Sequence, residues 1–441
     1  MVALDRHPAP ARAGPPGGRA LPPRTRRLLL PAARRHPGAR RRPDPSPPLR
    51  PPAVQPARAA GRAGDAPASP RRHHLPRTGA PVNDLTTPWH SIQVRYYETD
   101  KDALILDAVR PLLGELGDRV RQPYFVRHWR RGPHLRLNLR AADDVWQEEI
   151  LPLATERLGR YLGEHPSRAV LDEAALEEAH RALALRENEL GPLRPWYPDN
   201  TIQTEPYEDR RHVLGSQTLV DLLDHFHAES SRIAFGTLAA IRRGDLSLFQ
   251  LSLDLMIAFA HTSVPPISRG YMSFRSHADA FASYCVDRDG VRAGFEAKYR
   301  QHERQLRALV RRRVAEVDEG RTPPHVREWL DHVERGKALA APLIRDRRID
   351  LDAGPREPGM PQLHTVDFHE ILLATGRYRT EVLGSDWFLG HRLAVNTLYS
   401  HLGRLGLVPL QRYLFCHLVA AAVEAEYGIS PVEKALAWAR S

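Results

Sequence analysis

Cysteine is scarce in this chain, because its 441 residues include only two, Cys285 and Cys416. Two thiols are too few for a disulfide framework or for a zinc site built on cysteine ligands. Long apolar runs are also missing, since no segment approaches the roughly 18 consecutive apolar residues that cross a bilayer. These absences argue against a disulfide-stapled secreted protein and predict a cytoplasmic protein with no membrane partner.

The chain also lacks the short motifs of common cofactor and nucleotide enzymes. It has no glycine-rich phosphate loop, no dinucleotide fingerprint, no nucleophile elbow and no His-Glu-x-x-His motif. Asp224, His225 and His227 are metal-ligating residue types, but they lie in an apolar helical segment, where a structural role is more common. We therefore expect neither a metal nor an organic cofactor.

Positive charge is concentrated at the N-terminus. The first 81 residues hold 17 Arg and 3 Asp with no Lys or Glu, a formal +14, whereas the other 360 hold 47 basic and 50 acidic residues, a formal −3. The same stretch contains 19 of the 39 prolines and no Phe, Trp, Tyr or Ile. It lacks the apolar groups that offset chain entropy on folding. We expect residues 1–85 to form a disordered tail and 86–441 to form the folded domain.

This tail has two interpretations. It is either a basic arm that binds nucleic acid or an acidic partner, or the translation of GC-rich DNA upstream of a true start near Val82. The near-neutral body has no evident stripe of stacking aromatic residues. That favours the second interpretation and predicts no nucleic-acid partner.

Hydrophobic periodicity in the body predicts an α+β fold. Strands at 91–97, 124–130 and 134–140, with helices over 104–113 and 145–162, give a β-α-β-β-α sheet layer at the N-terminal side. The remainder is predicted to be mostly helical. The expected helices are 171–190, 214–241, 246–261, 291–318, 324–340 and 409–427, with loops at 191–209, 264–270 and 352–361.

The hairpin formed by the second and third predicted strands carries an unusual set of polar side chains. Alternation along the third strand places four of them on one face: His134, Arg136, Asn138 and Arg140. Arg127 and Trp129 share a face of the neighbouring strand. So many long cationic donors suit the bidentate binding of carboxylates or peptide carbonyls. The alternative is a solvated face balanced by acidic helix residues.

Further candidates lie at strand ends and in loops. Each also has a structural explanation, such as helix capping or a buried hydrogen bond. Ser273, Arg275 and His277 follow a Pro-Pro loop, with Ser276 as an ordinary helix N-cap. The other candidates are Tyr97 at the end of the first strand, Tyr207 in an aromatic and acidic loop, and Asn396 in a helical stretch with His391 and Tyr399.

The segment Phe125–Leu137 resembles the pattern F-[IV]-R-x(4–6)-G-P-H-L-R-[LF] of the thiopeptide-type bacteriocin biosynthesis family. That family is homologous to the C-terminal elimination domain of lantibiotic dehydratases, and the resemblance extends over roughly 86–430. Tyr207-Glu208 with Arg211 and Gly215 matches a downstream family region only loosely. The elimination-domain run His-Met-x-x-Asn-Arg-Leu is replaced here by His391–Asn396.

The resemblance implies one of two activities on a ribosomally made precursor peptide. The favoured one is pyridine synthesis, a formal aza-[4+2] cycloaddition of two dehydroalanines that expels the leader peptide. The alternative is elimination of glutamate from glutamylated Ser or Thr. For cycloaddition, the expected catalytic groups are Tyr97, Ser273 and His277, which favour the imidic-acid form of an amide. For elimination, His134 or a tyrosine is expected to abstract the α-proton. Other maturation enzymes are conceivable partners. The residues expected to bind the peptide are Arg127, Trp129, Arg136, Asn138, Arg140, Tyr207, Arg275 and Asn396.

Overall fold

A computed structural model describes residues 87–283, 285, 287–351 and 367–440. These residues all belong to one packing unit. The second unit, Arg6–Arg72, lies outside the described residues, as do the predicted tail 1–85 and the predicted linker 352–361.

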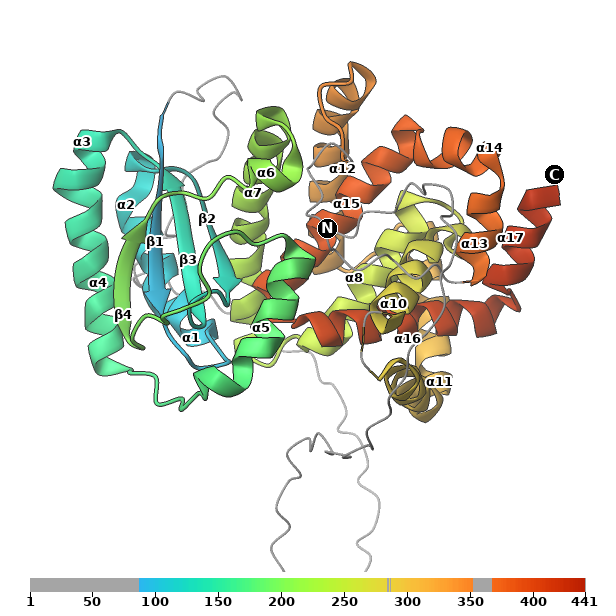
Figure 1. Cartoon of the computed structure of the whole chain (residues 1–441), viewed down its shortest axis with the longest axis horizontal. Helices are drawn as coiled ribbons and strands as arrows, with labels where there is room; N and C mark the ends of the chain where they lie inside the picture. The colour runs from blue at the N-terminus through green and yellow to red at the C-terminus, as the bar shows by residue number, and fades with distance from the viewer. Residues whose placement is uncertain (1–86, 284, 286, 352–366, 441) are drawn as a thin grey trace, which may run out of the picture. The chain divides into compact units, whose positions relative to one another are not determined.

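The sheet has four antiparallel strands in the order β2-β3-β1-β4 (Figure 1). Their bounds are β1 Trp89–Arg95, β2 Arg121–His128, β3 His134–Arg140 and β4 Thr201–Glu205. Three strands were predicted, and β3 has the predicted bounds. β4 lies within the expected loop 191–209, so that part of the prediction was wrong. This strand is short and pairs only with β1, so its sequence carries little of the alternation that marks a half-buried strand.

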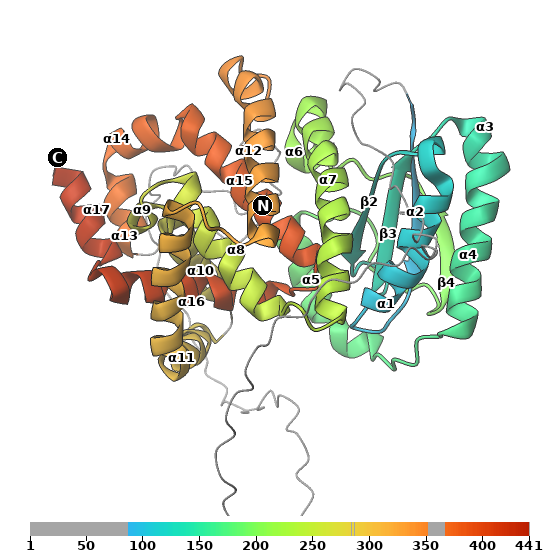
Figure 2. The same cartoon turned by 180° about the vertical axis from the view of Figure 1, so that it is seen from behind.

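The helices that follow β1 and β3 complete the predicted β-α-β-β-α layer, and α1 and α2 lie in front of the sheet in Figure 2. Just before the first helix, Asp100 Oδ1 accepts a hydrogen bond of 2.7 Å from the backbone N–H of Asp102, whereas the N-cap residue is Lys101, whose side chain makes no capping hydrogen bond. The helical segments are α1 Asp102–Leu104, a π-helical turn Ile105–Val109, α2 Arg110–Leu116, α3 Asp143–Val145, a π-helical turn Trp146–Ile150 and α4 Leu151–Glu164. The core beneath them contains six fully buried strand residues, Ile92, Val94, Phe125, Leu135, Leu137 and Leu139.

The rest of the described chain is mostly helical, as predicted, with β4 and connecting loops between the helices. α7 contacts β2 as well as α12 and α15, so it joins the sheet to the helical part. The elements are α5 Glu173–Glu187, α6 Arg211–Leu214, α7 Gln217–Arg242, α8 Leu248–Ser263, α9 Ile267–Gly270, α10 Met272–Ser283, α11 Arg288–Asp318, α12 Pro324–Arg345, α13 Asp367–Ala374, α14 Gly376–Tyr378, α15 Asp386–Arg404, α16 Pro409–Tyr427 and α17 Pro431–Arg440.

The helix around Ser276 begins earlier than its sequence suggests. Ser276 lies inside α10 rather than at its N-cap, because the chain turns helical at Met272. Its buried hydroxyl is 2.9 Å from His369 Nε2 instead of capping a backbone N–H. Ser276 therefore joins α10 to α13. Across the described ranges, no helix has both the length and the apolar character needed to cross a membrane.

Candidate functional site

The polar face of β3 is buried rather than solvated. His134 has an exposed fraction of 0%, and Arg136, Asn138 and Arg140 are also buried. Arg136 forms a 2.7 Å ion pair with Glu208, which lies just after β4. The guanidinium of Arg140 stacks over the Trp89 ring, with its carbon 4.7 Å from the ring centroid. Acidic groups from the β4–α7 segment thus neutralise this face.

Arg95, a buried arginine that was not among the predicted site residues, holds the β2–β3 turn in place. Arg95, 1% exposed, donates to the carbonyl oxygens of Arg130, Arg131 and Gly132 at 3.1–3.3 Å. Its Nη1 also lies 2.7 Å from His134 Nδ1. Burial, followed by repulsion from Arg136, lowers the pKa of Arg95 to about 10. The arginine remains charged at neutral pH and fixes the turn that precedes His134.

Tyr97 packs beneath the same turn. Its hydroxyl donates to the carbonyl oxygen of Tyr197, and a Cβ atom added at Gly132 would lie 2.4 Å from that hydroxyl. Gly132 has φ = +98°, a conformation that L side chains rarely adopt. Glycine is therefore required at position 132 by its backbone conformation and by the close approach of Tyr97. Catalysis by Tyr97 or His134 remains a prediction.

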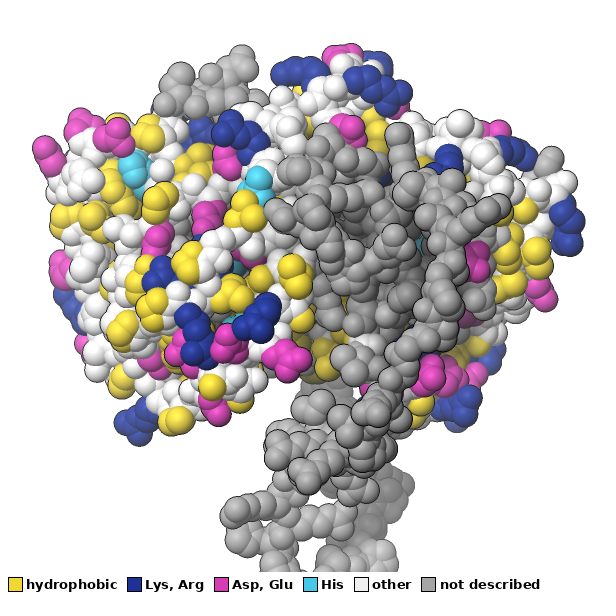
Figure 3. All heavy atoms as spheres, in the orientation of Figure 1, with side chains coloured by type: hydrophobic (Ala, Val, Ile, Leu, Met, Phe, Trp, Pro, Cys, Tyr) yellow, Lys and Arg dark blue, Asp and Glu magenta, His cyan; other side chains and the backbone are white. Residues whose placement is uncertain are grey.

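The other residues predicted to bind peptide near the sheet also have partners within the chain. Arg127 pairs with Asp102 and donates through Nε to the carbonyl oxygen of Arg404 at 2.9 Å. Trp129 Nε1 donates to Glu187 at 3.0 Å. On the face drawn in Figure 3, basic and acidic side chains are interspersed over the sheet-bearing part of the described chain. Peptide binding by these groups remains a prediction.

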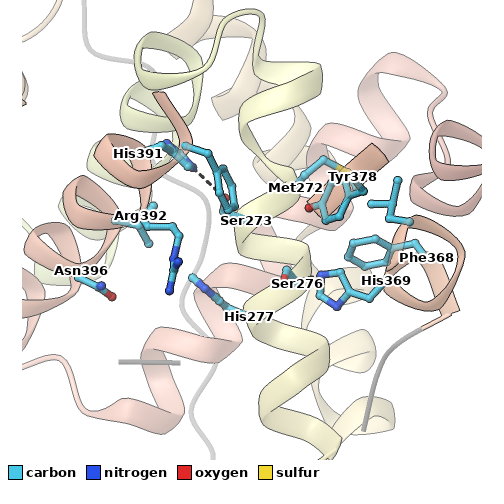
Figure 4. A pocket seen from close by; sticks show the side chains of 13 residues that line it. Met272, Ser273, Ser276, His277, Phe368, His369, Tyr378, His391, Arg392 and Asn396 are labelled. Carbon is cyan, nitrogen blue, oxygen red and sulfur yellow. Dashed lines mark hydrogen bonds between the residues drawn. The ribbon is translucent and has the colours of Figure 1, made fainter. Parts of the chain in front are cut away.

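A separate pocket lies in the helical part and brings together three of the predicted residues. Ser273 and His277, one turn apart on α10, and Asn396 on α15 all line it (Figure 4). Its volume of about 90 Å³ equals a few water molecules, enough for one small group of a substrate. The remaining lining residues are Met272, Ser276, Phe368, His369, Leu372, Tyr378, Phe388, His391, Arg392 and Val395.

Serine–histidine pairs are the chemical feature of this pocket. Ser273 Oγ lies 2.8 Å from His391 Nε2, and the other ring nitrogen of His391 lies 2.9 Å from Ser263 Oγ on α8. Ser276 pairs with His369 in the same way. The Nδ1 atom of His277 lies 2.7 Å from the hydroxyl of Tyr399.

The pocket histidines are neutral at physiological pH. Burial lowers the pKa of His391 to about 4, with a contribution from Lys337, and burial alone lowers that of His369 to about 4. Burial, followed by repulsion from Arg412, lowers the pKa of His277 to about 3. The pocket histidines therefore offer uncharged rings, each with one N–H donor and one acceptor nitrogen. His391, Val395 and Tyr399 follow one another at intervals of four residues on α15. This spacing in the sequence indicates that they share one face of the helix.

Arg275 belongs to an ion pair rather than to the pocket lining. Its Nε and Nη2 donate to the two carboxylate oxygens of Glu424 on α16 at 2.8 and 2.6 Å. This two-point pair joins α10 to α16. Tyr207 likewise lies away from the pocket, because its hydroxyl donates to Asp224 at 2.6 Å beside β2. Substrate binding by either residue remains a prediction.

The sheet residues and the pocket are connected through α15. Its residues His391 and Asn396 line the pocket, and its C-terminal residue Arg404 donates through Nε to the carbonyl oxygen of Phe125 on β2 at 3.0 Å. Within the described ranges, no group of three or more His, Cys, Asp or Glu side chains could hold a metal ion.

The chain is similar to a known protein family and to solved structures. A family model described as lantibiotic biosynthesis dehydratase C-term matches residues 89–423. The pyridine synthase TbtD from thiomuracin biosynthesis is 30% identical, with a TM-score of 0.63, and the match covers 78% of this chain and 100% of TbtD. TsrL, at 22% identity and a TM-score of 0.60, shares the fold over 79% of this chain and 98% of its own. No curated protein matches the chain. By the extent of the family match, the chain belongs to the lantibiotic dehydratase C-terminal family.

Proposed function

We propose that this protein is an enzyme of thiopeptide maturation that forms the central pyridine-type ring from two dehydroalanines of a precursor peptide and expels the leader peptide. The observation that carries the proposal is its 30% identity to a pyridine synthase whose whole length is covered. Membership in a family of peptide-modifying dehydratase domains supports an enzymatic role on a peptide.

The proposed reaction needs an amide in its imidic-acid form, which acts as the azadiene. Reaching that form requires one group that accepts the amide N–H proton and another that donates a proton or hydrogen bond to the carbonyl oxygen. Ser273, backed by His391, supplies the acceptor in our proposal, and His277 supplies the donor. The ring closes by forming two carbon–carbon bonds: the methylene carbon and the imidic carbon of the azadiene each bond to one alkene carbon of the second dehydroalanine. The imidic hydroxyl then leaves as water and the leader leaves as an amide, which gives the aromatic ring.

Positioning contributes most of the expected rate enhancement. Holding two distant alkenes of one peptide in contact can be worth about 7–11 kcal/mol. A pocket of about 90 Å³ admits one small alkene-bearing group. The arginine-rich hairpin, 124–140, is the proposed holding site for the rest of the peptide. Its charges are paired within the chain, so binding there would exchange an internal carboxylate for one of the peptide.

Glutamate elimination is the second candidate, because the matching family model is named for dehydratases. That reaction abstracts the α-proton of a glutamylated Ser or Thr and releases glutamate. The neutral Ser273–His391 pair is also an acceptable base for this step. Product analysis separates the two candidates, since only pyridine synthesis closes a ring.

The test is incubation of the full chain with a dehydrated, azole-bearing precursor peptide, followed by mass spectrometry. We expect a macrocycle and a leader peptide that ends in an amide. Ser273→Ala is expected to lower the rate by at least about 100-fold. Its matched control is Ser283→Ala, which removes a hydroxyl from the same helix that donates only to the Ala280 carbonyl. Release of glutamate from a glutamylated peptide without ring closure would replace the proposal by the elimination candidate.

A further inference from the structure

His277 is backed by two groups that do not line the pocket. The Tyr399 hydroxyl lies 2.7 Å from His277 Nδ1 and 3.2 Å from the sulfur of Cys416 on α16. Tyr399 is 8% exposed and Cys416 is 0% exposed. The row Cys416–Tyr399–His277 therefore runs from the core to the pocket. Of the three, only His277 lines the pocket, where Figure 4 labels it.

All three groups are uncharged, so each has one proton to place. Burial raises the pKa of the Cys416 thiol to about 12 and that of the Tyr399 phenol well above its usual value. Two arrangements of the protons satisfy the two contacts. In one, the thiol donates to the phenol oxygen and the phenol donates to Nδ1, which leaves a hydrogen on His277 Nε2. In the other, every bond is reversed and Nε2 carries a lone pair.

The geometry favours the first arrangement. A separation of 2.7 Å is typical of an O–H donor and lies at the short end of the range for an N–H donor. In the reversed arrangement the phenol would donate its proton to the thiol sulfur, which is a weak acceptor. In the first arrangement it donates to the imidazole nitrogen, which is a strong acceptor. Arg412 adds to this preference, since its guanidinium carbon lies 4.8 Å from the centroid of the Tyr399 ring. A cation over the ring face stabilises negative charge on the phenol and strengthens it as a donor.

We infer that Tyr399, supported by Cys416, is a positioning residue that fixes His277 as the Nε2–H tautomer, so that His277 presents a hydrogen-bond donor to a substrate carbonyl oxygen in the pocket. The catalytic consequence rests on the proposed function, whereas the tautomer is a property of the free protein. His277 is thereby assigned the acid side of the amide tautomerisation, and Ser273 with His391 the base side.

The tautomer is measured directly by NMR on the full chain labelled with ¹⁵N-histidine at pH 7.5. Long-range ¹H–¹⁵N correlations identify which ring nitrogen carries the proton, and His277→Gln assigns the signals by their loss. We expect a protonated Nε2 and an unprotonated Nδ1. Tyr399→Phe is expected to give a mixture of tautomers, whereas the control Tyr427→Phe, an exposed tyrosine at the end of α16, leaves the His277 signals unchanged. Protonated Nδ1 in the unsubstituted protein, or an unchanged spectrum in Tyr399→Phe, would overturn the inference.

Ring-forming kinetics provide the second measurement. Glutamine places an amide N–H near the position of Nε2 but cannot act as a base, so His277→Gln is expected to retain at least ten times the rate of His277→Ala. Tyr399→Phe is expected to lower kcat about fivefold with KM unchanged. Equal rates for the glutamine and alanine variants would overturn the donor role. If the unsubstituted protein shows the expected tautomer but forms no ring, the proposed function fails while the tautomer assignment stands.

Discussion

Replacement of Asp224 by asparagine tests the electrostatics of the interface between β2 and α7. Asp224 is 4% exposed, and its Oδ1 accepts from the Tyr207 hydroxyl at 2.6 Å and contacts that of Tyr124 at 3.1 Å. Its Oδ2 is buried without a hydrogen-bond partner among the described residues. Asparagine keeps the accepting oxygen and the shape of the side chain, but it cannot ionise.

The pKa of Asp224 gives the size of the effect. Burial raises that pKa from 3.8 to about 7, against the opposing influence of the two tyrosine hydrogen bonds. Between these values the unfolded chain has lost the proton that the folded chain still holds, so stability falls as pH rises. Each pH unit in this window lowers the free energy of unfolding by about 1.4 kcal/mol, and the whole window lowers it by about 4 kcal/mol. Below pH 3.8 and above pH 7, Asp224 no longer changes the free energy of unfolding with pH.

Urea unfolding of both proteins at pH 4.5, 6 and 7.5, followed by tryptophan fluorescence, measures this contribution. Other titrating groups act equally in both proteins, so the difference in unfolding free energy isolates Asp224. We expect the Asp224→Asn protein to gain about 3 kcal/mol relative to the parent between pH 4.5 and 7.5. Tyr207→Phe removes a bond that lowers the pKa, and it should extend the pH-dependent loss to higher pH. Parallel stability profiles for parent and Asp224→Asn would refute the reasoning.

Three other substitutions test the turn and the pocket. Gly132→Ala forces a side chain into a left-handed conformation and against Tyr97, and it should lower the free energy of unfolding by about 2 kcal/mol or more in urea titration. Arg95→Lys removes the planar fork that serves three turn carbonyls, and a loss of about 3 kcal/mol is expected in the same assay, with a smaller loss arguing against its bracing role. His391→Phe keeps the ring stacked near Phe259 but loses both serine contacts. Ring formation should fall about 100-fold while circular dichroism stays unchanged; an unaffected rate would remove His391 from the proposed chemistry.

Much of the fold was readable from local patterns. Strand β3 and helix α16 have the bounds that their sequences predict, because alternation and the i, i+4 pattern are strong within each segment. β4 was missed because an edge strand with one neighbour needs little apolar alternation. The start of α10 was missed because Pro265-Pro266 suggested a longer loop and Ser276 resembled a cap.

The site could be predicted only in part, because side chains far apart in sequence complete it. Ser273 and His277 share a face of one helix, so their proximity follows from spacing. Their partners His391 and Tyr399 lie more than 110 positions later, and no local pattern connects the two segments. Burial of the β3 arginines was equally hidden, since the acidic residues that cover them come from the segment after β4.

The division of charge between the two regions fits the proposed chemistry. The sheet region holds ionised groups in pairs, such as Arg136 with Glu208, which suits recognition of a charged peptide. The pocket holds neutral histidines, because burial keeps the pKa of His391 and His277 at about 4 and 3. Tautomerisation of an amide and cycloaddition change no net charge, so neutral donors and acceptors suit these steps. The pocket also contains one arginine, Arg392, in its lining. Neutral donors and acceptors with set proton positions can act throughout the pH range in which the protein is folded. The rate of ring formation should therefore follow the stability of the fold, not a histidine titration, between pH 6 and 8.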